Sequence, residues 1–158
     1  MATYKIRKFN PDKDIEAVQQ VNRRCLPENY PRFFFLEIAE KFPEGFNVAE
    51  MENGELAGYE MTRIERGLSN FGYGICKKGH IISIAVLDEY RRNRIAENLM
   101  VAAANALRVR DVKEIYLEVR ESNQAAINLY QKLGYQSLKI SAQYYNDGES
   151  AIIMVSKI

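Results

Sequence analysis

The sequence has little cysteine and no long apolar run, and each shortage argues against a class of protein. Its two cysteines, Cys25 and Cys76, have neither metal-ligand nor disulfide spacing, so we expect no metal site and a reducing, cytoplasmic location. No segment approaches the roughly twenty apolar residues of a membrane-spanning helix. The opening MATYKIRKF also lacks the apolar stretch of a signal peptide, so we expect a protein that does not act at a membrane.

The sequence also lacks an excess of charge of one sign. Its 22 Lys and Arg residues nearly balance its 21 Asp and Glu residues, which argues against a protein that binds nucleic acid over a broad surface. Apolar residues make up 47% and charged residues 27%, as in ordinary globular proteins. Because no repeat, linker or low-complexity segment divides the chain, we expect a single domain over residues 1–158.

Apolar periodicity and turn signals predict an α/β (α+β) fold, with a mixed sheet and helices on both of its faces. The polar, glycine-rich segment Gly67–Gly79 is interpreted as a mobile loop or as an irregular extension of the preceding hairpin. Strands are expected at residues 3–9, 46–51, 55–64, 81–87, 113–120, 136–145 and 150–155, and helices after Asn10-Pro11, over 33–42, after Arg94 and after Ser122 or Asn123.

The segment from His80 to Leu107 combines an apolar strand, a basic turn and an amphipathic helix. Arg91, Arg92 and Arg94 precede the helix, whose first turn has unpaired N–H groups and a partial positive charge. A phosphate group can bind to such amides with arginines around it. The alternative is an ordinary strand–helix unit with solvated arginines, and the residues alone leave both interpretations open.

The six residues from Arg91 to Ala96 resemble the loop that binds the pyrophosphate of acetyl-CoA in the GNAT superfamily of N-acetyltransferases. The family pattern is Arg or Gln, two residues, Gly, one residue, then Gly or Ala, and Arg94 stands in place of the glycine. The stretch from Ser122 to Tyr135 resembles the distal acetyl-CoA motif of the same superfamily.

This resemblance implies the GNAT fold, in which the strands at 80–87 and 113–120 splay apart and acetyl-CoA enters between them. It also implies which residues contact the cofactor. The residues expected to bind acetyl-CoA are Ile84, Ala85, Val86, Arg91, Arg92, Asn93, Arg94, Ile95, Ala96, Glu97, Asn123, Tyr130 and Lys132.

Four longer motifs narrow the resemblance to protein N-terminal acetyltransferases, most of all to single-chain relatives of the catalytic subunit of the NatA complex. The resemblance implies direct transfer, in a ternary complex, to the α-amine of peptides that begin with Ser, Ala or Thr, with Met-Leu peptides as a further class. We expect a monomer or weak dimer in the cytoplasm, and a partnership with the ribosome or an auxiliary subunit stays open. A small-amine or lysine acetyltransferase and a non-catalytic CoA-binding domain stay as alternatives. The four motifs are LPENY at 26–30, GHIISIAV at 79–86, YLEVRESN at 116–123 and YYNDGESA at 144–151.

Three side chains compete to take the proton of the substrate ammonium. By resemblance Glu28 faces the substrate N-terminus, although an exposed loop carboxylate also explains it. His80, the only histidine, begins the central strand in phase with Ile82 and Ile84. The alternative is a structural histidine at a strand end whose hydrogen bonds are satisfied. Glu118 lies mid-strand, where a carboxylate is costly unless it is paired or solvated, so His80 and Glu118 are expected to share a water.

Tyr130 is expected to point at the thioester sulfur, and a core tyrosine is the alternative. Tyr144 and Tyr145 are expected in the last hairpin, one in the core and the other lining a peptide groove. No second histidine is present to activate Cys25, which argues against covalent catalysis. The predicted catalytic residues are Glu28, His80, Glu118 and Tyr130, and the predicted substrate-binding residues are Leu26, Pro27, Glu28, Tyr30, Tyr144 and Tyr145.

Overall fold

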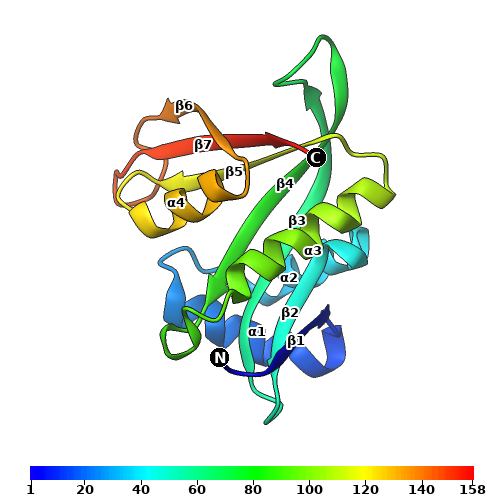
Figure 1. Cartoon of the computed structure of the whole chain (residues 1–158), viewed down its shortest axis with the longest axis vertical. Helices are drawn as coiled ribbons and strands as arrows, with labels where there is room; N and C mark the ends of the chain where they lie inside the picture. The colour runs from blue at the N-terminus through cyan, green and yellow to red at the C-terminus, as the bar shows by residue number, and fades with distance from the viewer.

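A computed structural model describes residues 1–158 and contains one seven-stranded sheet with helices on both faces (Figure 1). The strand order is β1-β2-β3-β4-β5-β7-β6, and only β4 and β5 are parallel neighbours. The order of elements along the chain agrees with the prediction. The elements are β1 (Tyr4–Lys8), α1 (Pro11–Cys25), α2 (Arg32–Lys41), the 3₁₀ turn η1 (Pro43–Gly45), β2 (Phe46–Met51), β3 (Leu56–Leu68), β4 (Ile75–Val86), the 3₁₀ turn η2 (Asp88–Tyr90), α3 (Ile95–Val109), β5 (Glu114–Arg120), α4 (Gln124–Lys132), β6 (Gln136–Ser141) and β7 (Ala151–Lys157).

The sheet separates two layers of core. Under α1 and α2, 14 buried residues pack together, among them Phe35 and Tyr59, which are fully buried. Under α3 and α4, 12 buried residues pack together, among them Leu107 and Ile115. The helices therefore bury the apolar stripes that their sequences predict. None of them has the length and hydropathy that a membrane-crossing helix requires.

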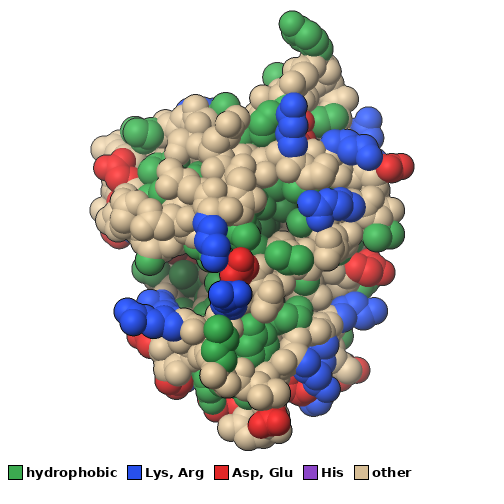
Figure 2. Space-filling model, in the orientation of Figure 1, with side chains coloured by type: hydrophobic (Ala, Val, Ile, Leu, Met, Phe, Trp, Pro, Cys, Tyr) green, Lys and Arg blue, Asp and Glu red, His purple; other side chains and the backbone are tan.

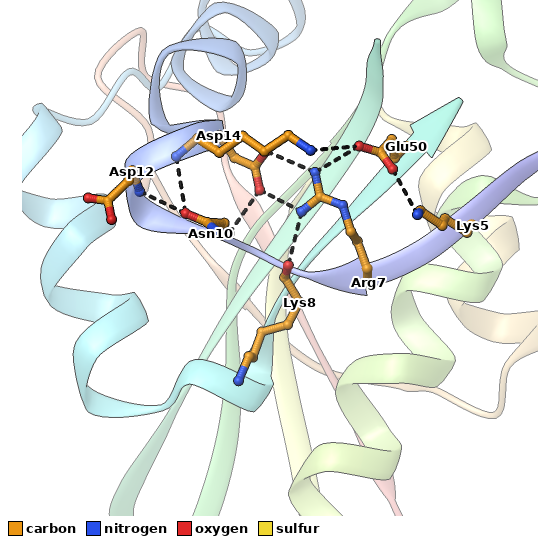
Figure 3. Close-up of polar contacts among 8 residues, drawn as sticks. Lys5, Arg7, Lys8, Asn10, Asp12, Asp14 and Glu50 are labelled. Atoms are coloured by element: carbon orange, nitrogen blue, oxygen red, sulfur yellow. Dashed lines mark hydrogen bonds and ion pairs between the residues drawn. The ribbon is translucent and has the colours of Figure 1, made fainter. Parts of the chain in front are cut away.

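The first helix begins at a cap that the sequence predicts. Asn10 accepts hydrogen bonds from two backbone N–H groups of the first turn, at 3.0 and 3.1 Å, and Pro11 occupies the first helical position. Figure 3 shows how the following turn is tied to the sheet. Arg7 on β1 donates to both carboxylate oxygens of Asp14, at 2.7 and 2.9 Å, and also to Glu50 on β2. This bidentate pair fixes α1 on the first two strands.

The two parallel strands separate as the GNAT fold requires. β4 and β5 pair only where Gly79–Ile81 lies beside Ile115–Leu117. Beyond Ile81, the edge of β4 that faces β5 therefore has backbone N–H and C=O groups without a strand partner. These groups are free to bind a ligand that enters between the strands.

A β-bulge in β4 changes the faces that its side chains reach. The register with β3 moves from Ser83 opposite Met61 to Ile81 opposite Thr62, so that Ile82 is an extra residue. Ile82 packs in the α1–α2 layer, whereas Ile84 packs in the layer of α3 and α4. The prediction that His80 is in phase with Ile84 is therefore wrong, because simple alternation does not include an inserted residue. His80 also lies within β4, which begins earlier, at Ile75.

The glycine-rich segment Gly67–Gly79 is an extension of the hairpin and not a loop. β3 continues to Leu68 and β4 begins at Ile75, so only a short turn remains between them. The resulting two-stranded ribbon projects from the body of the molecule at the top of Figure 1. Its polar composition is that of a ribbon exposed to water on both faces.

The last hairpin is shorter than predicted. β6 ends at Ser141 and β7 begins at Ala151, so Tyr144 and Tyr145 lie in the connecting loop. Neither tyrosine belongs to the core, and Tyr144 is 48% exposed, which corrects the expectation that one of them is buried. Side chains of this loop bind Arg120 on β5, as described below.

Candidate active site

A cleft of about 670 Å³ opens where β4 and β5 separate. The end of β4, the loop before α3 with the first turn of that helix, and α4 form its walls. In Figure 2 the surface is hollowed below the position of α4, and Lys and Arg side chains lie beside the hollow. The volume is typical of sites for cofactors. Most residues predicted to bind the cofactor line this cleft: Ile84, Ala85, Val86, Arg91, Arg92, Arg94, Ile95, Ala96, Glu97, Asn123 and Tyr130.

Two residues predicted to bind the cofactor do not line the cleft. Asn93 braces the loop, because its amide donates to the backbone oxygens of Tyr90 and Arg91 at 3.0 and 3.2 Å. Lys132 is exposed and pairs at 3.5 Å with Glu97, which does line the cleft. Direct contact of Asn93 and Lys132 with the cofactor stays a prediction.

Arg94 takes the place of the family glycine and adopts a backbone conformation that glycine favours. Its φ of 60° and ψ of 23° are left-handed, and Arg92 has a φ of 66°. Such a conformation costs about 1–2 kcal/mol for a residue with a side chain. Arg94 is the N-cap residue of α3 and makes no side-chain capping bond, so the first N–H groups of the helix stay available. Amides and arginines together form a site suited to a pyrophosphate.

The opposite wall of the cleft is α4. Asn123 caps this helix by accepting a hydrogen bond from the Ala126 N–H at 3.3 Å, and Gly134, at a φ of 98°, follows its end. Tyr130 is 6% exposed, lines the cleft, and forms no hydrogen bond through its hydroxyl. Burial raises the pKa of Tyr130 to about 12, so the phenol stays protonated at neutral pH. The anion site, the apolar walls and the free phenol together make a cleft that is suited to bind acetyl-CoA.

His80 lies between two carboxylates on the α1–α2 side of the sheet. Its Nε2 is 2.7 and 2.8 Å from the two oxygens of Glu118, and its Nδ1 is 2.7 Å from Glu65. The Tyr116 ring stacks on the imidazole with centroids 4.2 Å apart. Tyr144 donates to Glu118 at 3.1 Å. The structure thus brings together His80 and Glu118, as the sequence predicted, but the contact is direct and not through water.

Glu28 is held by Arg120, which lies on β5 two residues after Glu118. Arg120 donates to Oε1 of Glu28, to Asp147 at 2.9 Å and to Glu149 at 2.8 Å, and its guanidinium lies 4.0 Å from the Tyr145 ring centroid. The same arginine therefore ties the 26–30 loop to the loop between β6 and β7. The second oxygen of Glu28, Oε2, forms no hydrogen bond and stays free for a cationic ligand.

The other predicted substrate residues lie around these carboxylates. Tyr30 stacks on Phe34 at 4.9 Å, and burial first, then the charges of Glu28 and Glu118, raises its pKa. The pKa of Tyr144 rises to about 12 through burial and the nearby Glu118. Leu26 lines the cleft, whereas Pro27 is exposed beside it in the chain. The two candidate bases thus converge around Tyr30 and Tyr144.

Sequence reasoning missed Glu65, Tyr116 and Arg120. Glu65 and Tyr116 stand in alternating patterns that are typical of solvated strand residues, and Arg120 follows Val119 in the same way. The one available signal was the pair of carboxylates in the last motif, because Asp147 and Glu149 both bind Arg120 across the sheet. Nothing in the local sequence predicts which arginine supplies it.

Comparison with known proteins agrees with this geometry. A model of the acetyltransferase (GNAT) family matches residues 15–135. The chain is 46% identical over 148 residues to an N-alpha-acetyltransferase of Sulfurisphaera tokodaii, covering 92% of this chain and 88% of that protein. It is 40% identical over 151 residues to the N-terminal acetyltransferase A complex catalytic subunit NAA10 of Arabidopsis thaliana, covering 94% and 75% of the two chains.

A solved structure shows the same fold. Naa20 of Chaetomium thermophilum in complex with a bisubstrate analogue matches with a TM-score of 0.85 and 27% identity, over 98% of this chain and 86% of that chain. The family model spans well over half of the sequence, and the cleft fits the acetyl-CoA that such enzymes use. The chain therefore belongs to the acetyltransferase (GNAT) family.

Proposed function

We propose that this acetyltransferase acts on the α-amine of protein N-termini, with a preference for Ser, Ala and Thr and with Met-Leu termini as a second class. The observation that carries the proposal is the convergence of two carboxylate systems, Glu28 with Arg120 and Glu118 with His80, around Tyr30 and Tyr144. A cationic amine needs such an anionic receiving site, and an α-amine with a pKa of about 7.7–8.0 must lose its proton before it reacts. The names of the relatives support the same class of substrate.

The chain's own residues provide each part of the transfer. Acetyl-CoA supplies an acetyl thioester, and the unpaired backbone of β4 after Ile81 offers hydrogen bonds to it. A carboxylate takes one proton of the substrate ammonium, and the neutral amine nitrogen attacks the thioester carbon. The carbon–sulfur bond then breaks, and the second nitrogen proton passes to solvent or to the departing CoA thiolate. Cys25 lines the cleft, but burial raises the pKa of its thiol and Val86 O accepts from its Sγ at 3.5 Å, so direct attack by the amine is favoured over a covalent step.

Tyr130 stabilises the leaving thiolate as a hydrogen-bond donor more than as an acid. Its pKa of about 12 lies above the value of about 8.5 that is usual for a thiol, so full proton transfer is uphill by several kcal/mol. A hydrogen bond to a charged group nevertheless contributes about 1.5–3 kcal/mol, and here it strengthens as the sulfur becomes negative.

Turnover of acetyl-CoA on a panel of acceptors tests this function. Peptides that begin with Ser, Ala, Thr or Met-Leu should be acetylated, while N-terminally blocked peptides with internal lysines and polyamines should react far more slowly. Preference for a polyamine or an internal lysine would refute the proposal, and binding of CoA without turnover would identify a non-catalytic domain.

We further propose that the enzyme works in the cytoplasm as a monomer or weak dimer, on chains that leave the ribosome, with or without an auxiliary subunit. Its two cysteines are free, which suits a reducing compartment. Sedimentation of the purified protein, alone and with ribosomes of its own source, tests the state of assembly. A stable higher oligomer, or absence from ribosomal fractions at low salt, would contradict this part.

A further inference from the structure

We propose that Glu65 is a positioning residue of the reaction: together with Tyr116 it holds His80 in one tautomer and one orientation, so that the Nε2–Glu118 pair receives the substrate proton. The inference rests on the proposed role of His80 and Glu118 as a base. Glu65 comes from β3 and touches the site only through His80, on the side of the ring away from Glu118.

The hydrogen bonds around Glu65 assign the proton on Nδ1. Tyr116 donates its hydroxyl to Oε1, Arg63 donates Nε to Oε2 at 2.5 Å, and His80 Nδ1 lies 2.7 Å from Oε2. Burial raises the pKa of Glu65, but these three donors outweigh it and hold the pKa at about 2. The carboxylate is therefore only an acceptor, and Nδ1 must be the donor.

The proton on Nδ1 determines the hydrogen-bonding role of Nε2. With Nδ1 protonated, a neutral His80 has its lone pair on Nε2, directed at Glu118 at 2.7 Å. Two acceptors at that distance repel each other unless a proton lies between them, so the geometry places the Nε2–Glu118 pair to receive the substrate proton. Glu65 at the other nitrogen fixes the tautomer and the orientation of the ring, as a carboxylate does behind a catalytic histidine.

The ring has no freedom to leave this arrangement. Tyr116 stacks on it with an interplanar angle of 14°, and the Tyr116 hydroxyl is itself bound to Glu65. Lys78 lies 4.9 Å from the centroid of the Tyr116 ring. Charged and titratable side chains of the neighbouring elements face the cluster: Arg63 and Glu65 from β3, Lys78 from β4, Glu118 from β5, and the neutral phenols of Tyr30 and Tyr144 from the two loops.

In the proposed step the ammonium first gives one proton to the Nε2–Glu118 pair, and the neutral amine then attacks the thioester carbon. The nitrogen loses its second proton, to solvent or to the departing CoA thiolate, as the carbon–sulfur bond breaks. Glu65 stays ionised and stabilises the positive charge on the imidazole through Nδ1–H. The pair later returns the proton to solvent, so Glu65 changes the strength of the base without carrying the proton itself.

The variant Glu65→Gln tests the inference. We expect kcat on the Met-Leu peptide class to fall about 10-fold or more, within the range of a general-base contribution, while the KM for acetyl-CoA stays unchanged. The acid limb of kcat/KM should move to lower pH, because loss of the negative charge weakens the hold of the pair on its proton. Tyr116→Phe removes one donor to Glu65, and with it the restraint that the hydroxyl places on the stacked ring, but keeps the negative charge. Its kcat should therefore fall by less, and its acid limb should not move to lower pH.

Glu114→Gln is a matched control, since Glu114 is a buried glutamate that accepts from Ser69 and Asn70 away from the site. Its pH profile should equal that of the wild type. An unmoved acid limb in Glu65→Gln would overturn the inference, even if its melting temperature falls. His80→Ala and Glu118→Gln distinguish a wrong base assignment from a wrong role for Glu65. Full activity in both variants would mean that the base assignment is wrong. Loss of activity in these two variants but not in Glu65→Gln would mean that the role of Glu65 is wrong.

Discussion

Replacing Arg94 with glycine restores the family motif and has two opposite effects. The left-handed backbone of Arg94, at a φ of 60°, costs about 1–2 kcal/mol, and glycine removes that cost. Glycine in turn loses about 0.5–1 kcal/mol more conformational entropy on folding. The net gain of up to about 1.5 kcal/mol corresponds to a rise in melting temperature of a few degrees in a protein of this size.

Cofactor affinity should change in the other direction. The exposed guanidinium of Arg94 lines the cleft, and an exposed ion pair contributes about 0.2–1 kcal/mol, so its loss should weaken acetyl-CoA binding by up to about fivefold. The loss should fade as salt rises, because exposed charges are screened. Calorimetry of acetyl-CoA binding at low and high salt, with a thermal melt of each variant, measures both effects.

Arg92→Gly is the matched control, because Arg92 also lines the cleft with a positive φ but does not stand at the family glycine. Both variants should gain similar stability. A lower melting temperature for Arg94→Gly would refute the strain argument. Tighter binding of acetyl-CoA by Arg94→Gly would show that close backbone approach outweighs the lost charge.

Three further perturbations test other parts of the structure. Tyr130→Phe should lower kcat about 10–100-fold with an unchanged KM for acetyl-CoA, which steady-state kinetics measures; a changed KM alone would mean that Tyr130 only packs. Arg120→Met should raise the KM for peptide and spare that for acetyl-CoA, because it frees the loops of Glu28 and Glu149; equal effects on both substrates would argue against this role. Burial raises the pKa of Glu60 to about 8 from 4.5, so the neutral carboxyl stabilises the fold fully below about pH 4.5 and this contribution is lost as pH rises toward 8. Glu60→Gln should therefore gain on the wild type by at most about 1.4 kcal/mol per pH unit in that window, and a constant difference in melts from pH 5 to 8 would contradict a protonated Glu60.

The elements of the fold follow from local signals in the sequence. Asn10-Pro11 begins a helix, Gly134 ends one, and Asn53-Gly54 turns a hairpin, each through its own backbone chemistry. The bulge at Ile82 was not predicted, and for the β3–β4 ribbon the sequence left a mobile loop and an extension of the hairpin both open. Neither an inserted residue nor a solvated ribbon changes the local amino-acid composition of the chain. Both features depend on how the strand pairs with its neighbour.

The site was predictable where it resembles family motifs and not where it depends on distant partners. The loop at Arg91–Ala96 and the pair of His80 with Glu118 were expected from the sequence. Arg120 meets Glu28 across 92 positions of the chain, and Glu65 meets His80 only because β3 folds back along β4. Contacts of this kind are set by the register of the sheet, which no short pattern contains.

The most direct test of the central claim, two bases serving one pocket, is kcat/KM for two peptide classes on three proteins. We expect Glu28→Gln to lose most on peptides that begin with Ser or Ala, because a small first residue lets the amine reach the free Oε2 of Glu28. We expect His80→Ala with Glu118→Ala to lose most on Met-Leu peptides, by about 10²–10⁴-fold where that pair is the sole base. Equal losses on both peptide classes, with a lower melting temperature in the double variant, would contradict the claim.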